Sequence, residues 1–352
     1  MKTIYLHIGT PKTGTTYLQE FLRKNNKLLK EIGIYYPIEK DKKYVYSRPH
    51  VSLSWQHVPI IPSITGVKVN WLTSEETFLD GEALDELLRD IENAKEDKIL
   101  LSSEVFYDVF TNKALIRNLR NAFNRYNVKI IVYLRRQDQY LLSYFQEGCK
   151  GGTFTSFNLE KILRLYHSSL CYYSRLSKWA DVFGDSNIIV RPFEKNQLRE
   201  NSLSKDFLSI IGIYDYSNFE EIPAINESLT LEQVIFLMNI NKYLIGVLEN
   251  DDDIKKIIHQ KVRERVIRNK AILQRGNINQ LLSYEERKKI LEIYSCENEN
   301  VVNRFLKEKT DKLFMEEPII IESKFHEFTL DENTRFEAYA SLIKEIVSES
   351  QI

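Results

Sequence analysis

The stretch HIGTPKTGTTYLQ, residues 7–19, limits the possible folds of this chain more than any other feature. Gly9 and Gly14 have the glycine spacing of a phosphate-binding loop, G-x-x-x-x-G-K-[ST]. A short apolar run over residues 3–8 precedes the loop, and apolar residues at helical spacing follow it from Thr15 onward. A strand, a glycine loop and a helix in this order predict an anion cradle made of backbone N–H groups and a helix N-terminus.

The lysine of this loop is displaced from its usual position. Thr15 and Thr16 follow the second glycine, and Lys12 lies inside the loop. Kinases and ATPases place the lysine after the second glycine, where it reaches the β- and γ-phosphates, and follow it with a Ser or Thr on Mg²⁺. The apolar run KILLSSE, residues 98–104, ends without an aspartate that would hold that ion. A ligand with a shorter phosphate chain and no metal ion therefore fits this loop better.

Apolar runs alternate with amphipathic segments over the first two thirds of the chain. We predict strands at residues 3–8, 98–104, 128–136 and 187–194, and helices at residues 81–94, 114–126, 139–148 and 172–183. Continuous Ile, Val and Leu strands that alternate with helices indicate a parallel sheet covered on both faces. The expected fold class is α/β, with a P-loop-like parallel sheet flanked by helices and a helical C-terminal part.

Beyond about residue 226 the sequence keeps only the helical period. It has this period over residues 229–248, 251–273 and 282–306. We therefore expect a single domain, residues 1–352, with an α/β core over residues 1–225 and a helical C-terminal subdomain over residues 226–352. A long irregular segment inside such a domain is often functional, and the stretch over residues 39–65 is of this kind.

Composition narrows the classes of function. The formal net charge of −1 argues against a general polyanion binder, so no nucleic-acid partner is expected. Cys149, Cys171 and Cys296 are far apart and form no Cys/His cluster, which predicts free thiols in a reducing compartment and no metal site. No stretch reaches the roughly 18 apolar residues of a membrane span, and the N-terminus lacks a signal peptide. We expect a cytoplasmic protein without an integral membrane segment.

The segment TPKTGTTYLQ resembles the 5′-phosphosulfate-binding loop of sulfotransferases, which use 3′-phosphoadenosine 5′-phosphosulfate (PAPS) as donor. That family has a second signature, an arginine at a strand end and a serine eight positions later on the next helix. In VYLRRQDQYLLSYF these are Arg135 and Ser143. The resemblance is to bacterial, carbohydrate-type sulfotransferases and is specific over residues 3–26 and 128–146. It implies a PAPS-dependent sulfotransferase with PAPS as co-substrate and no metal.

The resemblance also implies which residues hold the donor. The 5′-phosphosulfate would lie on the loop residues Pro11, Lys12, Thr13, Gly14, Thr15 and Thr16. Arg135 and Ser143 would hold the 3′-phosphate, because a guanidinium group and a hydroxyl group both donate hydrogen bonds to phosphate oxygens. Arg136 is the alternative arginine for this role. In sulfuryl transfer negative charge develops on the bridging oxygen of the leaving 5′-phosphate, and a lysine inside the loop can stabilise it. The displaced Lys12 is therefore expected to act there.

A base must take the proton of the acceptor hydroxyl. Glu104 follows the run ILLSS at the carboxyl edge of the expected sheet, where ligands bind in open α/β folds, and is the leading candidate. The alternative interpretation of Glu104 is a helix-initiating residue. His50, in the irregular segment, is the alternative base, whereas His7 lies in the first strand and is expected to be a core histidine.

Aromatic side chains near the irregular segment offer stacking surfaces for a sugar. These are Tyr44, Tyr46, Trp55 and Trp71. By analogy the acceptor is expected to be a hydroxyl of a carbohydrate, a glycan or a glycolipid, and a protein or small-molecule acceptor remains open. Arg191 and the pair Arg275-Gly276 are further residues that could approach the donor. Two other functions remain open, an ATP-dependent P-loop kinase with a deviant loop and a non-catalytic nucleotide-binding protein.

Overall fold

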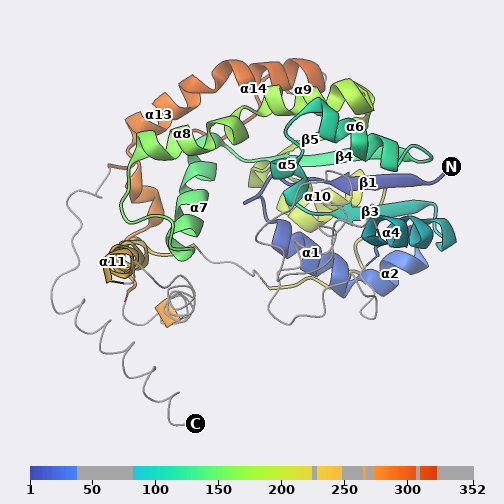
Figure 1. Cartoon of the computed structure of the whole chain (residues 1–352), viewed down its shortest axis with the longest axis horizontal. Coiled ribbons are helices and arrows are strands. Elements are labelled where there is room, and N and C mark those ends of the chain that lie inside the picture. The colour runs from blue at the N-terminus through green and yellow to red at the C-terminus, as the bar shows by residue number, and fades with distance from the viewer. Residues whose placement is uncertain (38–81, 224–227, 248–264, 267–272, 307–309, 323–352) are drawn as a thin grey trace, which may run out of the picture. The chain divides into compact units, whose positions relative to one another are not determined.

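The computed structural model describes residues 1–37, 82–223, 228–247, 265–266, 273–306 and 310–322 (Figure 1). The chain divides into two compact units. The first consists of Met1–Arg136, Ser168–Asn226 and Tyr294–Glu316. The second consists of Gln137–His167, Glu227–Ile293 and Glu317–Ile352. Both units draw on segments from before and after residue 225, and the linear division of the chain at that residue stays a prediction.

The first unit is built on a parallel sheet of five strands in the order β2-β3-β1-β4-β5. The strands are β1 (Thr3–His7), β2 (Ile34–Tyr35), β3 (Lys98–Ser102), β4 (Asn127–Leu134) and β5 (Ile188–Pro192). The expected α/β fold class, a parallel sheet flanked by helices, is confirmed, and so are the four predicted strands. Sequence reasoning missed β2, because two residues are too few to show a period.

Helices connect the strands and cover the sheet. The first unit contains α1 (Thr15–Lys24), α2 (Asn26–Glu31), α4 (Glu82–Asn93), α5 (Val105–Val109), α6 (Lys113–Ala122), α9 (Tyr172–Phe183), α10 (Leu203–Ile210), α14 (Ser295–Val301) and a π-helical turn over Val302–Leu306. Of the predicted helices, residues 81–94, 114–126 and 172–183 correspond to α4, α6 and α9.

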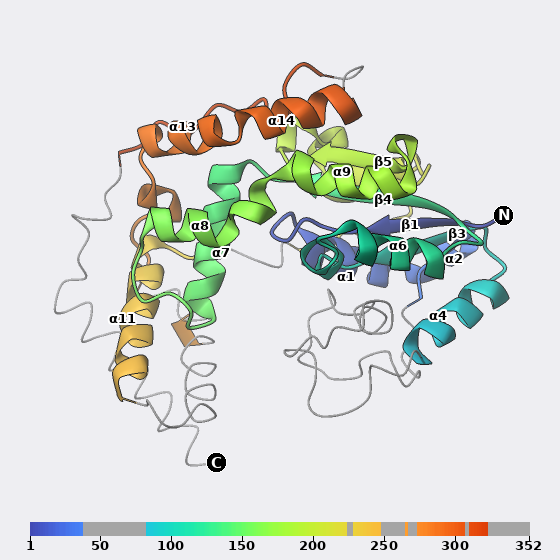
Figure 2. The same cartoon turned by 45° about the horizontal axis from the view of Figure 1, so that its top comes forward.

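Each face of the sheet has its own hydrophobic cluster, because successive side chains of a strand point to opposite faces. On β4, Ile130 and Val132 belong to one cluster, and Ile131 and Tyr133 belong to the other. Helices α4, α5, α6, α9 and α14 complete the first cluster, and α1, α2 and α10 complete the second. In Figure 2, α6 and α9 lie on the viewer's side of the strands.

The second unit is helical in its described part. It contains α7 (Gln137–Lys150), α11 (Leu231–Val247), α13 (Tyr284–Ile293) and most of α8 (Leu159–Leu170). The predicted helices over residues 139–148 and 229–248 are α7 and α11, whereas α8 was missed. Asp138 and Arg287 form a fully buried ion pair of 2.7 Å, which joins α7 to α13. No described helix is long and apolar enough to cross a membrane.

The connections around β1 create a switch in the direction of the chain. β1 and β3 are parallel neighbours with His7 opposite Ser102, so both strands end at the same edge of the sheet. From there the chain enters α1 on one face after β1, and α5 on the other face after β3. Ligands of open α/β sheets bind at such a switch point, outside the carboxyl ends of the strands.

Candidate active site

The glycine loop begins as a continuation of the sheet. Ile8 donates its N–H to the carbonyl of Ile131 at 3.0 Å, and Thr10 donates to the carbonyl of Tyr133 at 2.9 Å. The Thr10 hydroxyl donates to the same carbonyl at 3.0 Å. These hydrogen bonds hold the first half of the loop along β4. The second half, from Pro11 to Gly14, forms the turn that leads into α1.

Gly9 and Gly14 lie at two close contacts of the loop. Gly9 has a φ of 101°, and a Cβ there would lie 2.9 Å from the Cβ of Glu104. Gly14 has a φ of 75° and is the N-cap of α1, and a Cβ there would lie 2.7 Å from Leu203 Cδ2. Both backbone conformations favour glycine. The glycine spacing read from the sequence thus reflects two tight points at the ends of the loop.

The N-terminus of α1 has the properties of an anion site. Gly14 supplies no side-chain cap, and the first turn contains no acidic residue. The first N–H groups of an α-helix have no partner within the helix, and they carry the positive end of its dipole. Thr15 and Thr16 stand in this turn, with Thr15 buried and Thr16 partly exposed.

The threonine hydroxyls of the loop have different partners. Thr13 is buried, and its hydroxyl donates to the carbonyl of Thr10 at 2.5 Å, which closes the loop on itself. Thr15 hydrogen-bonds the carboxyl group of Glu104. Lys12 is partly exposed and has a φ of 66°. Thr13 therefore shapes the loop, whereas Lys12 and Thr15 connect it electrostatically to Glu104.

Glu104 lies beside this loop, as its position after β3 predicted. It is the N-cap residue of α5, but its side chain makes no capping hydrogen bond to that helix. Desolvation raises the pKa of Glu104 above its ordinary value. Its own backbone N–H, hydrogen bonds from Gln19 and Thr15, and the charge of Lys12 act in the opposite direction. The result is a carboxyl group whose pKa is shifted toward neutral pH, where a general base works best.

A chain of polar contacts runs from β1 to Glu104. His7 is 1% exposed, and its Nδ1 lies 2.8 Å from Ser102 Oγ. The side-chain amide of Gln19 donates to Ser102 Oγ at 3.2 Å and to Glu104 Oε2 at 3.3 Å. Burial lowers the pKa of His7 to about 3, so this histidine is neutral at ordinary pH. His7 is therefore a core histidine, as expected.

Sequence reasoning missed Gln19. Gln19 stands four residues after Thr15, so helical geometry places both on one face of α1. The hydrogen bonds of both side chains to Glu104 show that this face is turned toward the end of β3. The four-residue spacing was the available signal, but the sequence alone does not say which face of α1 meets β3.

Two adjacent arginines follow β4, and the structure separates them. Arg135 is partly exposed, and its Nη1 donates to the carbonyl of Lys12 at 2.8 Å. The guanidinium carbon of Arg135 also lies 5.9 Å from the ring centroid of Phe193. Arg136 is 1% exposed, and its Nη1 donates to the carbonyl of Glu316 at 2.6 Å. Of the two arginines, Arg135 is therefore the one that contacts the glycine loop.

The other predicted residues belong to other parts of the chain. Ser143 lies in α7, which belongs to the second unit, and is described within that unit. His50 lies outside the described residues. The four aromatic residues expected near the acceptor, Tyr44, Tyr46, Trp55 and Trp71, lie outside them as well.

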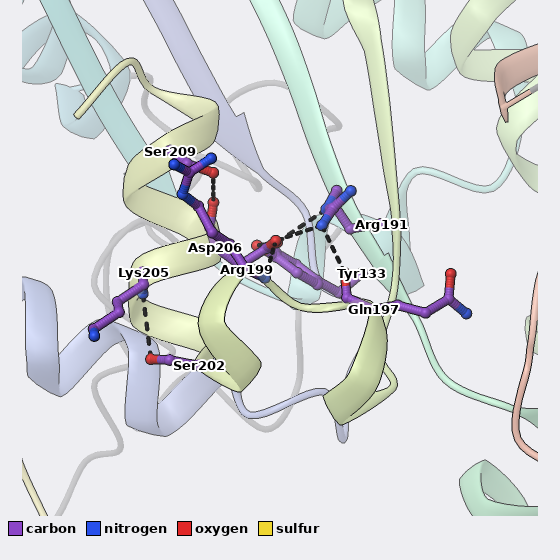
Figure 3. Close-up of polar contacts among 8 residues, drawn as sticks. All are labelled: Tyr133, Arg191, Gln197, Arg199, Ser202, Lys205, Asp206 and Ser209. Carbon is purple, nitrogen blue, oxygen red and sulfur yellow. Dashed lines mark hydrogen bonds and ion pairs between the residues drawn. The ribbon is translucent and has the colours of Figure 1, made fainter. Parts of the chain in front are cut away.

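Arg191 serves the structure of the first unit (Figure 3). Its Nε donates to Asp206 Oδ2 at 2.9 Å, and its Nη2 contacts Asp206 Oδ1. Asp206 is 1% exposed and also accepts from the Tyr133 hydroxyl at 2.8 Å and from the Arg199 N–H at 2.9 Å. This arrangement joins β5 and β4 to α10 and gives Arg191 a structural role.

Arg275, the other late arginine, lies in the second unit. Its Nε donates to Glu232 Oε1 at 2.5 Å, and its N–H donates to Glu232 Oε2 at 2.7 Å. Among the described residues, no group of three or more His, Cys, Asp or Glu side chains gathers in a way that could hold a metal ion.

No family model matches the chain. A protein of Archaeoglobus fulgidus described as "Uncharacterized protein" is 30% identical over 223 residues, which are 63% of this chain and 57% of that protein. This chain thus spans little more than half the length of that relative.

Two solved structures are similar to this one, and both are sulfotransferases. The sulfotransferase from Alicyclobacillus acidocaldarius matches with a TM-score of 0.41 and 15% identity, over 72% of this chain and 99% of that chain. The mouse sulfotransferase SULT7A1 complexed with PAP matches with a TM-score of 0.39 and 14% identity, over 88% of this chain and 89% of that chain. Any function of this chain therefore has to be inferred from its own site.

Proposed function

We propose that this chain is a PAPS-dependent sulfotransferase that transfers a sulfuryl group to a hydroxyl group of an acceptor. One observation carries the proposal: a lysine inside the glycine loop acts electrostatically on a carboxyl group with a raised pKa at the end of the neighbouring strand. In-line transfer needs a cation at the leaving oxygen and a base at the entering oxygen. Lys12 and Glu104 are of these two chemical types.

The donor set of the loop fits the 5′-phosphosulfate. Gly9 and Gly14 both have a positive φ and lie close to other residues, so they hold the two ends of the loop in place. The uncapped first turn of α1 offers N–H groups, which bind phosphate oxygens well. In this proposal Pro11, Thr13, Thr15 and Thr16 shape or line the cradle, and Lys12 provides the charge.

The second phosphate of the donor is assigned to Arg135. Its contact with the Lys12 carbonyl keeps it at the loop, and a guanidinium group is suited to a phosphate. The assignment of Ser143 as its partner rests on the resemblance in sequence alone.

The reaction balances with these residues. The acceptor oxygen forms a bond to sulfur while the bond between sulfur and the bridging oxygen of the 5′-phosphate breaks. The proton of the acceptor hydroxyl moves to the Glu104 carboxylate, and the electron pair of the broken bond stays on the phosphate oxygen beside Lys12. Adenosine 3′,5′-bisphosphate (PAP) and the sulfated acceptor leave as products.

The acceptor in this proposal is a glycan or glycolipid hydroxyl. That part rests on the aromatic residues named from the sequence. His50, the alternative base, would take over the proton transfer if Glu104 only shaped the loop.

Ligand binding separates this function from a kinase. A ligand at 100 times its dissociation constant stabilises the folded state by about 2.7 kcal/mol, which thermal unfolding detects. We expect PAP to raise the melting temperature without a metal ion. Stabilisation by Mg-ATP and not by PAP would support the P-loop kinase and exclude the sulfotransferase.

Turnover separates it from a non-catalytic binding protein. Labelled PAPS is incubated with a panel of hydroxyl acceptors, and we expect transfer by the wild type and a large loss in Glu104→Gln. If the chain binds PAP but transfers sulfate to no acceptor in the panel, the non-catalytic alternative is favoured. If Glu104→Gln keeps full activity, the base is another residue, and His50→Ala is the next variant.

A further inference from the structure

We infer that Gln19 is a positioning residue for Glu104, which it holds at the glycine loop through its side-chain amide. This inference rests on the proposed function, because it treats Glu104 as the base. Gln19 is 0% exposed and belongs to α1, whereas Glu104 follows β3, 85 residues later. The contact joins the helix that begins at the anion cradle to the carboxyl group beside it.

The geometry uses both hydrogens of the amide. Gln19 Nε2 donates to Ser102 Oγ at 3.2 Å and to Glu104 Oε2 at 3.3 Å, and an amide nitrogen has two hydrogens to donate. The opposite orientation of the amide would turn its carbonyl oxygen toward the carboxylate, an arrangement of two acceptors. Ser102 in turn contacts His7 Nδ1 at 2.8 Å, so the serine is held from β1 as well.

A neutral donor suits a base better than a cation would. A hydrogen bond to the charged form of a carboxyl group lowers its pKa, as a nearby positive charge does, but it adds no charge to the site. Glu104 already has Lys12 on the loop side, and its charge also acts on Tyr36. His7, the remaining titratable group of the network, is neutral because burial lowers its pKa to about 3. Gln19 therefore orients the carboxylate and opposes the effect of desolvation without bringing a second positive charge beside it.

The test is the pH dependence of the full-length Gln19→Met variant, which keeps the length of the side chain and removes the donor. We expect the acidic limb of kcat/KM for PAPS turnover to move to higher pH by about one unit, because the ionised form of Glu104 loses a hydrogen bond. Tyr17→Phe is the matched control. It removes one hydrogen bond of the same helix, from the Tyr17 hydroxyl to Glu221 at 2.6 Å, and should leave the limb in place.

A second measurement does not depend on turnover. In chains labelled with ¹³C at the glutamate carboxyl carbons, the resonance that disappears in Glu104→Gln reports Glu104, and its titration midpoint should rise in Gln19→Met. If Gln19→Met does not fold, Ser102→Ala removes the second acceptor of the Gln19 amide nitrogen and should shift the midpoint in the same direction.

The outcomes are distinct. A folded Gln19→Met with an unmoved acidic limb and an unmoved carboxyl titration overturns the inference and leaves the sulfotransferase proposal intact. A wild type that turns over no PAPS removes the proposed function, and with it the role of Glu104 as a base.

Discussion

Arg135 Nη1 donates to the carbonyl oxygen of Lys12 at 2.8 Å, across 123 residues of sequence. The bond ties the end of β4 to the glycine loop at a residue whose φ of 66° lies in the left-handed region, which few side chains favour. Because the acceptor is the main chain of Lys12, substitution of the lysine side chain leaves this contact in place. A substitution of Lys12 can therefore remove the charge of the loop while the hydrogen bond that holds its backbone remains.

Lys12→Ala should lower the turnover of PAPS by roughly 100-fold to 1000-fold, the usual loss when one stabiliser of a developing negative charge is removed. The melting temperature should stay close to that of the wild type, since the loop keeps its hydrogen bond to Arg135. Initial rates with labelled PAPS measure the effect. Lys27→Ala removes a lysine whose side chain is 93% exposed and serves as the control. Near-normal turnover in Lys12→Ala would refute the assigned role.

Glu104→Gln should stabilise the fold at neutral pH, whatever it does to activity. The pKa of Glu104 is raised in the folded state. At a pH below its ordinary pKa, the group is protonated in both the folded and the unfolded state, so it does not change the free energy of unfolding. As the pH rises, the unfolded chain ionises first, and the wild type loses stability relative to the variant. The difference in melting temperature should be near zero at about pH 4 and grow toward pH 7.

A matched carboxyl group checks the previous prediction. The Glu31 side chain is 59% exposed, and Glu31→Gln should show no such pH-dependent gain. If Glu104→Gln instead loses stability relative to the wild type as the pH rises, the fold stabilises the Glu104 carboxylate. The pKa of Glu104 would then be lowered by folding, which contradicts the prediction.

Gly9→Ala should destabilise the fold more than Gly33→Ala. Both glycines have a positive φ, 101° and 83°, so both substitutions bear the backbone penalty of about 1 kcal/mol. A Cβ at Gly9 would lie 2.9 Å from Glu104 Cβ, whereas a Cβ at Gly33 meets nothing within 4 Å. Overpacking typically adds about 1–3 kcal/mol. Denaturant unfolding of the two variants gives the difference, and equal losses would contradict the tight contact.

Arg191→Met should cost stability without changing the chemistry of the site. It leaves the buried Asp206 carboxylate without its cation, and breaking a buried pair costs roughly 3–5 kcal/mol. We expect the lower end of that range, because the Arg191 side chain is 23% exposed. Lys205→Met breaks the exposed pair with Glu200 and should cost much less, because exposed ion pairs contribute little to stability. A similar loss in both variants, measured by denaturant unfolding, would contradict this.

The local elements followed from the sequence because their causes are local. The helix predicted at residues 172–183 is α9 with the same bounds, and the strand predicted at residues 128–136 contains nearly all of β4. Hydrophobic period, β-branched runs and glycine spacing act over a few residues, so they can be read directly. The two-residue strand β2 had no such pattern, since it exists only through its pairing with β3.

The composition of the site could be predicted only in part. The loop residues and Glu104 were found because each stands next to the end of an apolar run. Gln19 was not, since a glutamine inside a helix has no distinguishing pattern until its neighbour across the sheet edge is known. The sequence by itself determined a parallel α/β sheet with a glycine loop, a displaced lysine and a glutamate at neighbouring strand ends.

Only the tertiary structure decided which side chains of these elements meet. It placed Arg135 against Lys12 and buried Arg136 against Glu316, although the two arginines are adjacent in sequence. It also brought Gln19 to Glu104 across 85 residues. The physical reason is the same in each case. Strand order, register and the packing of helices on a particular face arise from interactions between distant segments, and these set the partner of each side chain after the local elements have formed.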